Sequence, residues 1–286
     1  MRRLDKVRGV LFYTLILNMA VAGVKILYGY KTDSISMLSD GFHSFFDGIS
    51  NVIGLVGIWV ASKPPDKCHP YGHRKYETLS TIAVAMLIFI GAFEIFKKAY
   101  FSFKDPPGIE VTTLSFTIMV LTILINITVM TYETRKGQEL KSDFLLADAL
   151  HTKTDVFVSI SVIVSLIAAK MGYPLIDSIT AILIGILIVR MGFGILRSAA
   201  DVLTDAACID TKAISDVVLL IEGIKGCHEI RTRGREGAVN LDLHVLVDPE
   251  VETHRAHDLA HSVEEAIKEK FPSVVDVVVH VEPHNK

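Results

Sequence analysis

Two copies of one pattern of acidic residues and histidine stand inside long apolar stretches of this sequence. The pattern D-x2-H-x3-D occurs as Asp40, His43 and Asp47, and again as Asp148, His151 and Asp155. In a helix, this spacing places the three side chains of each copy on one face. Ionisable groups at membrane depth are costly, so their presence in such stretches indicates a function.

Imidazole and carboxylate groups from two helices could bind one divalent cation. Within each copy, the histidine and the second aspartate are one helical turn apart, so a single ion could touch both. Two such pairs on facing helices supply four nitrogen and oxygen ligands, which suits tetrahedral Zn2+. The expected transport site consists of His43, Asp47, His151 and Asp155. The other two aspartates, Asp40 and Asp148, are expected to orient a histidine or to act as vestibule charges.

The same ligands also bind protons. Two buried carboxylates are penalised in an apolar setting unless a metal ion or protons neutralise their charge. Metal and protons then compete for the same lone pairs, which is the physical basis of metal/proton antiport. Polar contacts between helices are the alternative explanation for one motif alone, and the duplication at equal spacing favours a functional role.

A second candidate metal site lies in the short segment D-K-C-H-P-Y-G-H, residues 66–73. Its expected ligands are Asp66, His69 and His73, with Cys68 as an additional donor. The proline and glycine between the histidines favour a tight turn. A hydrated loop with surface histidines fits the spacing equally well, and the segment could instead attract cations to an entrance.

A third candidate site lies in the C-terminal part of the chain, which holds most of the histidines. His280 and Glu282 are two residues apart in an expected strand, so they share a face. Histidines also recur at helical spacing between residues 254 and 261. The expected metal ligands of this region are His228, His244, His257, His261, His280 and Glu282, whereas His254 and His284 are expected to be bystanders.

The composition indicates a membrane protein. The 286 residues are 50% hydrophobic, with a mean hydropathy of +0.43. Apolar stretches long enough to cross a lipid bilayer occur at residues 9–30, 34–62, 77–100, 111–134, 145–169 and 176–199. Arg135-Lys136-Gly137 is expected to end the fourth stretch. The net charge of -3 gives no indication of nucleic-acid binding, and three scattered cysteines predict no disulfide framework.

Two domains are predicted: a six-helix transmembrane domain over residues 1–205, and a cytosolic metal-binding domain over residues 206–286. Lys and Arg are more numerous in the loops on the side of the termini, so both termini are expected in the cytosol. The expected elements of the second domain are a helix at 209–220, strands at 225–233 and 239–247, a helix at 253–270 and a strand at 274–282. This αββαβ order predicts a ferredoxin-like α+β fold, with helices on one face of an antiparallel sheet.

These motifs resemble the cation diffusion facilitator family over nearly the whole chain. SDGFHSFFD is similar to the family's second-span signature, and ADALHTKTD to its fifth-span signature. The resemblance implies a homodimer in which each protomer has its own transport site. It also implies that the second and third candidate sites bind metal, and that Lys75 and Asp205 form a charge pair at the dimer contact.

The expected function is export of Zn2+ from the cytosol across the inner (plasma) membrane, coupled to inward proton flow. Histidine in both motifs favours zinc, whereas an all-carboxylate site would favour Mn2+. Fe2+, Co2+, Ni2+, Mn2+ and Cd2+ stay open as substrates. A membrane-anchored metal sensor is a distant alternative, and an enzyme is not expected, because the H-E-x-x-H motif of metalloproteases is absent.

Overall fold

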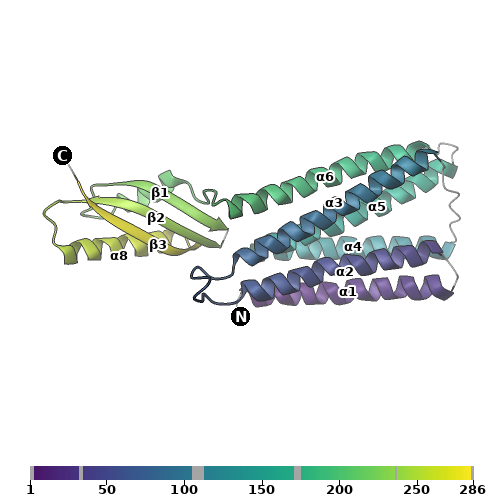
Figure 1. Cartoon of the computed structure of the whole chain (residues 1–286), viewed down its shortest axis with the longest axis horizontal. Helices are drawn as coiled ribbons and strands as arrows, with labels where there is room; N and C mark the ends of the chain where they lie inside the picture. Colours follow the sequence, from purple (N-terminus) through teal and green to yellow (C-terminus); the bar gives the residue numbers. More distant parts are fainter. Residues whose placement is uncertain (1–2, 32–34, 105–112, 171–174, 236, 285–286) are drawn as a thin grey trace. The chain divides into compact units, whose positions relative to one another are not determined.

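The computed structural model describes residues 3–31, 35–104, 113–170, 175–235 and 237–284. Six long helices are followed by a small α+β unit (Figure 1). The chain divides between Ala199 and Ala200 into two compact units.

The first unit consists of helices α1 (Arg3–Lys31), α2 (Ile35–Ala61), α3 (Lys75–Lys104), α4 (Thr113–Leu140), α5 (Asp143–Lys170) and α6 (Leu175–Leu203). They have 27 to 30 residues each, so each is about 40 Å long at about 1.5 Å per residue. This length exceeds the roughly 30 Å hydrocarbon core of a bilayer. Among the described residues, α1, α3, α4 and α6 are long and apolar enough to cross a membrane, and α2 contributes the shorter apolar segment Gly48–Ala61.

Large apolar side chains cover the outside of these helices. Phe12, Leu27, Phe93 and Leu183 are each at least 58% exposed. In a water-soluble protein such side chains would be buried against a core, whereas a membrane protein presents them to lipid. The inside of the bundle is also apolar and includes the fully buried ring of Phe144.

The corner between α4 and α5 differs from the prediction. The helix does not end at Arg135-Lys136-Gly137 but continues to Leu140, so that prediction was wrong. The chain reverses at Lys141, which has a φ of 49°, and the N–H of Ser142 donates to Gly137 O at 2.9 Å. This bond closes a Schellman-type C-cap. Gly137 lies inside the helix because α5 approaches closely there: a Cβ on it would come within 2.9 Å of the Leu146 side chain.

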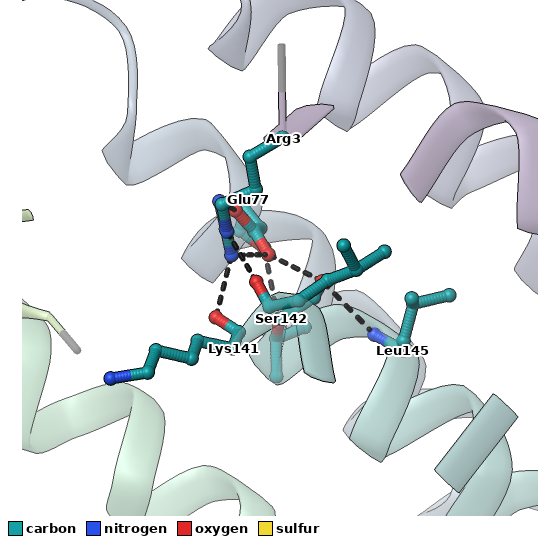
Figure 2. A network of polar contacts seen from close by, with 7 residues as sticks. Arg3, Glu77, Lys141, Ser142 and Leu145 are labelled. Carbon is teal, nitrogen blue, oxygen red and sulfur yellow. Dashed lines mark hydrogen bonds and ion pairs between the residues drawn. The ribbon is translucent and has the colours of Figure 1, made fainter. Parts of the chain in front are cut away.

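A polar network joins this corner to the beginnings of α1 and α3 (Figure 2). The Arg3 guanidinium donates to both carboxylate oxygens of Glu77, at 3.2 and 3.3 Å, and to the carbonyl oxygen of Lys141 at 2.6 Å. Ser142 donates its hydroxyl to Glu77 Oε1 at 2.6 Å and accepts the N–H of Leu145 as the N-cap of α5. Three segments far apart in sequence are therefore fixed around one buried carboxylate.

The second unit has the predicted αββαβ order. Its elements are α7 (Thr211–Val218), β1 (Gly226–Arg235), β2 (Ala238–Val247), α8 (Thr253–Lys270) and β3 (Val274–Pro283). The strands form one sheet with β2 in the centre. Residues of β2 alternate between buried and half-buried, and its inner side chains pack with Leu259, Val263 and Ile267 of α8 and with α7. Both helices therefore cover one face of the sheet, and the other face is free for polar side chains.

The sheet is mixed rather than antiparallel, which corrects the prediction. β1 pairs with β2 in the antiparallel sense, but β2 and β3 are parallel. The reason is the helix between them: α8 carries the chain back across the sheet, so β3 starts at the same end as β2. The parallel pairing sets which residues of β3 stand beside those of β2, and this matters for the histidines described next.

Candidate metal sites

A pocket between four helices holds one half of the predicted transport site. Its lining consists of Asn18 and Val21 from α1, Ser44 and Ser50 from α2, Asn126 from α4, and His151, Thr152 and Asp155 from α5. The polar lining is unusual for the interior of an apolar bundle. Because α2 also contacts α5 directly, the two helices that carry the D-x2-H-x3-D motifs are neighbours.

His151 and Asp155 present a nitrogen and a carboxylate to this pocket. They are one turn apart on α5 and both line the pocket. The Nδ1 atom of His151 is buried and has no hydrogen-bond partner among the described residues. Buried polar atoms are rarely left without a partner, so this nitrogen is suited to bind a ligand that enters the pocket.

The other half of the predicted site lies on α2. Asp40, His43 and Asp47 belong to this helix, but their side chains lie outside the described residues. Ser44, which directly follows His43, lines the pocket. The closure of one metal site by His43, Asp47, His151 and Asp155 therefore stays a prediction.

Lys25 is a buried cation beside this pocket that the sequence analysis missed. It lies on α1, is only 4% exposed, and donates from Nζ to Ser44 Oγ at 2.8 Å. The signal was present in the sequence, because an ionisable residue in the middle of an apolar stretch is itself unusual. Its ammonium group brings a positive charge close to a pocket that is lined by a carboxylate.

Asp148 does not line the pocket but anchors the helix that carries His151. It is 2% exposed and accepts a hydrogen bond from Asn51 Nδ2 at 2.6 Å. The amide oxygen of Asn51 in turn accepts from Asn18 Nδ2 at 3.0 Å. This chain of hydrogen bonds joins α5, α2 and α1 one turn away from His151, so it can fix the position of that ligand.

Glu133 is a second buried acid that the sequence analysis did not single out. It belongs to α4 and is fully buried. It stands two residues before Arg135-Lys136, where charged residues are expected to flank a membrane span. The sequence therefore offers no reason to expect a buried carboxylate at this position.

The loop between α2 and α3 brings together its three predicted ligands. Donor atoms of Asp66, His69 and His73 lie within 4.8 Å of one another. Asp66 Oδ1 is 3.4 Å from His69 Nδ1, and Asp66 Oδ2 is 3.4 Å from His73 Nε2. The Nδ1 atom of His73 lies 3.2 Å from the carbonyl oxygen of Pro64. Because a carbonyl only accepts, Nδ1 donates there, and Nε2 is the ring nitrogen that faces Asp66 and can bind a metal ion when it carries no proton.

Backbone geometry keeps the loop carboxylate ionised. The N–H of His69 donates to Asp66 Oδ1 at 2.7 Å, and this bond is the main reason why the pKa of Asp66 is lowered from its ordinary value. The N–H of Cys68 adds a bond to the same oxygen at 2.9 Å, and His73 contributes by its charge. Cys68 therefore supports the loop through its backbone, and its thiol is exposed.

In the second unit, three predicted histidine ligands stand side by side across the sheet. His228 of β1 is the direct partner of His244 on β2, and His244 is the direct partner of His280 on β3. Glu282 reaches the same place: its carboxylate lies 3.0 Å from His244 Nδ1, 3.3 Å from His228 Nε2 and 3.5 Å from His280 Nε2. These four residues occupy the sheet face that the helices leave free.

A bulge in β1 adds a carboxylate to this cluster that the sequence did not reveal. The register of β1 shifts between His228 and Arg231, and Glu229 has a φ of 46° in this bulge. Its carboxylate lies 3.7 Å from His244 Nε2. Bulges often redirect a side chain in this way, and they cannot be read from residue alternation.

The other two predicted ligands of this region lie elsewhere within one chain. His257 and His261 are exposed on α8, and their Nε2 atoms are 3.1 Å apart. Since α8 packs on the opposite face of the sheet, these histidines do not join the cluster of His228, His244, His280 and Glu282. His254 is 86% exposed. Lys75 and Asp205 belong to different compact units, and their pairing stays a prediction.

Comparison with protein families gives two matches that cover almost the whole chain. Residues 11–204 match the cation efflux transmembrane domain, and residues 207–284 match the cytoplasmic domain of cation efflux proteins. The first match contains the helices around the pocket and the loop. The second contains the sheet with its histidine cluster.

Relatives along the full length support the same assignment. An uncharacterized transporter of Methanocaldococcus jannaschii is 32% identical over 95% of this chain and 96% of its own length. The manganese efflux system protein MneS of Bacillus subtilis is 30% identical, over 93% of this chain and 91% of its own. The cation-efflux pump FieF of Serratia proteamaculans is 28% identical, over 91% of this chain and 87% of its own.

Proposed function

Since the chain belongs to the cation efflux family (the cation diffusion facilitators), whose members transport divalent metal ions and are not enzymes, we propose that it exports Zn2+ from the cytosol in exchange for protons. The proposed transport ligands are His43, Asp47, His151 and Asp155. The observation that carries this proposal is the pocket beside His151, whose imidazole Nδ1 has no partner in the part of the chain that the structure describes and lies one helical turn from the Asp155 carboxylate.

The ligand chemistry favours Zn2+. Two imidazoles and two carboxylates suit a tetrahedral ion that accepts both nitrogen and oxygen donors. Four ligands on two neighbouring helices can be opened to either side of the membrane by a small movement of one helix against the other. Transport then needs no change in the ligands themselves. It requires only that water reaches them first from one side of the membrane and then from the other.

Proton exchange is supported by the energetics of export. Moving a positive charge out of a cell against the membrane potential costs about 2.3 kcal/mol per charge for each 100 mV. A doubly charged ion therefore needs a driving force, and protons that enter the cell supply one. The same carboxylates and imidazoles bind protons when the metal leaves, so a single site can serve both ions.

A second candidate substrate is Mn2+. The relatives MneS and MneP of Bacillus subtilis are named as manganese efflux system proteins and are 30% and 27% identical to this chain. The pocket also has the amide side chains of Asn18 and Asn126 in its lining, and amide oxygens suit the harder Mn2+ ion. Fe2+, Co2+, Ni2+ and Cd2+ are further substrates to compare.

We also propose that the chain works as a homodimer in the inner membrane, with both termini in the cytosol. The excess of Lys and Arg in the loops on the side of the termini supports this orientation. The position of His257 and His261 on the outside of α8 supports a partner chain, because a neighbouring copy could bring other ligands to them. Metal bound at the cytoplasmic domains would then favour their association.

Flux into sealed vesicles tests this function. The purified protein is reconstituted with a pH-sensitive dye inside, and Zn2+, Mn2+, Fe2+, Co2+ and Ni2+ are added in turn. We expect Zn2+ uptake with proton movement in the opposite direction. Binding without flux would instead identify a membrane-anchored sensor, and Mn2+ flux that exceeds Zn2+ flux would identify the second candidate.

His43→Asp tests the basis of selectivity in the same assay. Replacing an imidazole with a carboxylate makes the site harder, so transport should broaden toward Mn2+ and Cd2+. The matched control is His254→Asp, because His254 is exposed on α8 and is not among the residues that line the pocket. An unchanged order of substrates in His43→Asp would show that this residue does not select the ion.

A further inference from the structure

Glu133 is a buried acid that the proposed metal site does not use. Its side chain is fully buried in α4, and neither carboxylate oxygen has a hydrogen-bond partner among the described residues. An ionised carboxylate with no hydrogen-bond donor is strongly unfavourable in an apolar bundle. The burial of Glu133 therefore needs a compensating cation, and the smallest candidate is a proton.

The neighbours of Glu133 do not provide this compensation. Thr14 faces it from α1, and Asp148 and Thr152 face it from α5. Thr14 donates its hydroxyl to the carbonyl oxygens of Val10 and Leu11, at 3.2 and 3.3 Å, and Thr152 donates to the carbonyl oxygen of Asp148 at 3.2 Å. Both hydroxyl protons are thus engaged by the backbone of their own helices.

The charged group that faces Glu133 is another acid, Asp148. Asp148 accepts a short bond from Asn51 Nδ2, which stabilises its ionised form. Two carboxylates that face each other in a buried site cannot both ionise without a large electrostatic cost. Asp148 accepts from Asn51, whereas the hydroxyls beside Glu133 donate to the backbone of their own helices, so the proton belongs on Glu133.

From this geometry we infer that Glu133, with Asp148 beside it, forms a proton-binding site separate from the metal ligands. The site takes one proton from water to form the O–H bond of the acid, and returns it to water when that bond breaks. The inference rests on the proposed exchange of metal for protons, and it assigns one of those protons to a residue outside the transport ligands.

The pocket provides the coupling between this site and the metal. Thr152 lines the pocket and also lies beside Glu133, and Ser50 lines the pocket and also lies beside Asp148. A divalent ion in the pocket would therefore be separated from Glu133 by the Thr152 side chain, and its charge would stabilise an ionised Glu133 and so expel the proton. By linkage, the proton on Glu133 weakens metal binding by the same factor.

Counting protons on metal binding tests the inference. Zn2+ is added to saturation to the full-length protein in a weakly buffered solution with a pH dye, and the protons released per protein chain are counted. Glu133→Gln cannot hold a titrating proton, so we expect it to release one proton fewer than the wild type. Glu139→Gln is the matched control, because Glu139 is exposed on the same helix and pairs with Lys136. It should release as many as the wild type.

Infrared spectroscopy gives a readout that does not require a variant to fold. With isotope-labelled glutamate, the wild-type protein should show a protonated carboxylic acid before Zn2+ is added and lose it afterwards. Glu133→Asp should retain the proton release, because the acid is preserved. The absence of a protonated glutamate in the metal-free wild type would overturn the inference, and so would an unchanged proton count in Glu133→Gln.

The vesicle assay separates this inference from the proposed function. If the wild type moves metal without any proton movement, the proposed antiport is wrong. If the wild type exchanges metal for protons and Glu133→Gln keeps the same number of protons per metal ion, only the role of Glu133 is wrong.

Discussion

Arg3 and Glu77 form an ion pair that joins the beginnings of two helices 74 residues apart in sequence: Arg3 Nη1 lies 3.2 Å from Glu77 Oε2. The carboxylate is buried, and its Oε1 atom also accepts the hydroxyl of Ser142 at the α4–α5 corner (Figure 2). Arg3 in turn donates to the carbonyl oxygens of Leu140 and Lys141, which close α4. One buried acid therefore satisfies groups from three separate segments.

Glu77→Ala should destabilise the helical unit by about 2 kcal/mol, because it leaves a half-buried guanidinium and a buried hydroxyl without their partner. Thermal unfolding of the detergent-solubilised protein measures this effect. The control is Glu94→Ala on the same helix, where an exposed carboxylate lies 3.7 Å from Lys97. We expect a change of less than about 1 kcal/mol there. Equal effects of the two substitutions would mean that the network around Glu77 does not stabilise the helical unit.

Asp155→Asn should reduce metal flux by about 100-fold or more, since it preserves the size of the side chain but removes the charge that neutralises the cation. Asp47→Asn should act in the same way if α2 supplies the other half of the site. Flux into vesicles measures both, and size-exclusion chromatography checks that the proteins still fold. Lys153→Ala is the control, because it lies on α5 but does not line the pocket. Normal flux in Asp155→Asn would show that Asp155 is not a transport ligand.

The sequence predicted the architecture well because its signals are local. Apolar length is enough to find six helices, and the alternation in β2 is enough to orient its inner residues toward α7 and α8. Simple periodicity places His280 and Glu282 on one face of their strand, and the structure brings His228 and His244 beside His280. Their alignment in one row across three strands, however, depends on the pairing of β2 with β3, and that pairing is parallel because α8 lies between them.

The wrong or missing predictions concern residues whose surroundings are set by tertiary packing. Gly137 looked like a helix end, but α5 packs so closely against it that glycine is needed inside the helix. Glu133 stands near the basic residues that flank a membrane span, so only the packing of neighbouring helices shows it to be buried. Lys25 differs, because its place in the middle of an apolar stretch was a signal that the sequence already contained. Glu229 approaches His244 through a bulge, which residue alternation cannot reveal.

His244→Ala should abolish most of the metal-induced stabilisation of the cytoplasmic domain. His244 is the centre of the cluster, with Glu282 at 3.0 Å and Glu229 at 3.7 Å. A metal ion at 100 times its dissociation constant stabilises its folded site by about 2.7 kcal/mol. Hydrogen exchange of the β2 amides in the full-length protein, with and without Zn2+, measures this gain in protection.

His254→Ala is the control for the cytoplasmic cluster, because this histidine is exposed at the start of α8 and lies away from the sheet. It should keep the metal-induced protection of β2. If His244→Ala also keeps the metal-induced protection of β2, the cluster is an acidic and imidazole-rich surface that binds no metal.

The loop site should lose metal and lose its fold in two separate pH ranges. Imidazole is a stronger base than a carboxylate, so acid should displace a metal ion from the loop before it protonates Asp66. The pKa of Asp66 is lowered, mainly by the His69 N–H. A carboxylate whose pKa is lower in the folded state than in the unfolded state stabilises the fold at pH values above the unfolded-state pKa. This contribution is lost as the pH falls through the folded-state pKa.

Hydrogen exchange of the loop amides at several pH values tests this separation. Because the N–H groups of Cys68 and His69 both donate to Asp66 Oδ1, their protection should persist in the pH range where acid has already displaced the metal ion. It should decline only when Asp66 takes up a proton. Asp66→Asn should lower this protection at every pH, and Asp210→Asn, at the N-cap of α7, should leave it unchanged. Loss of loop protection and of metal in the same pH range would show that the metal, not Asp66, holds the loop.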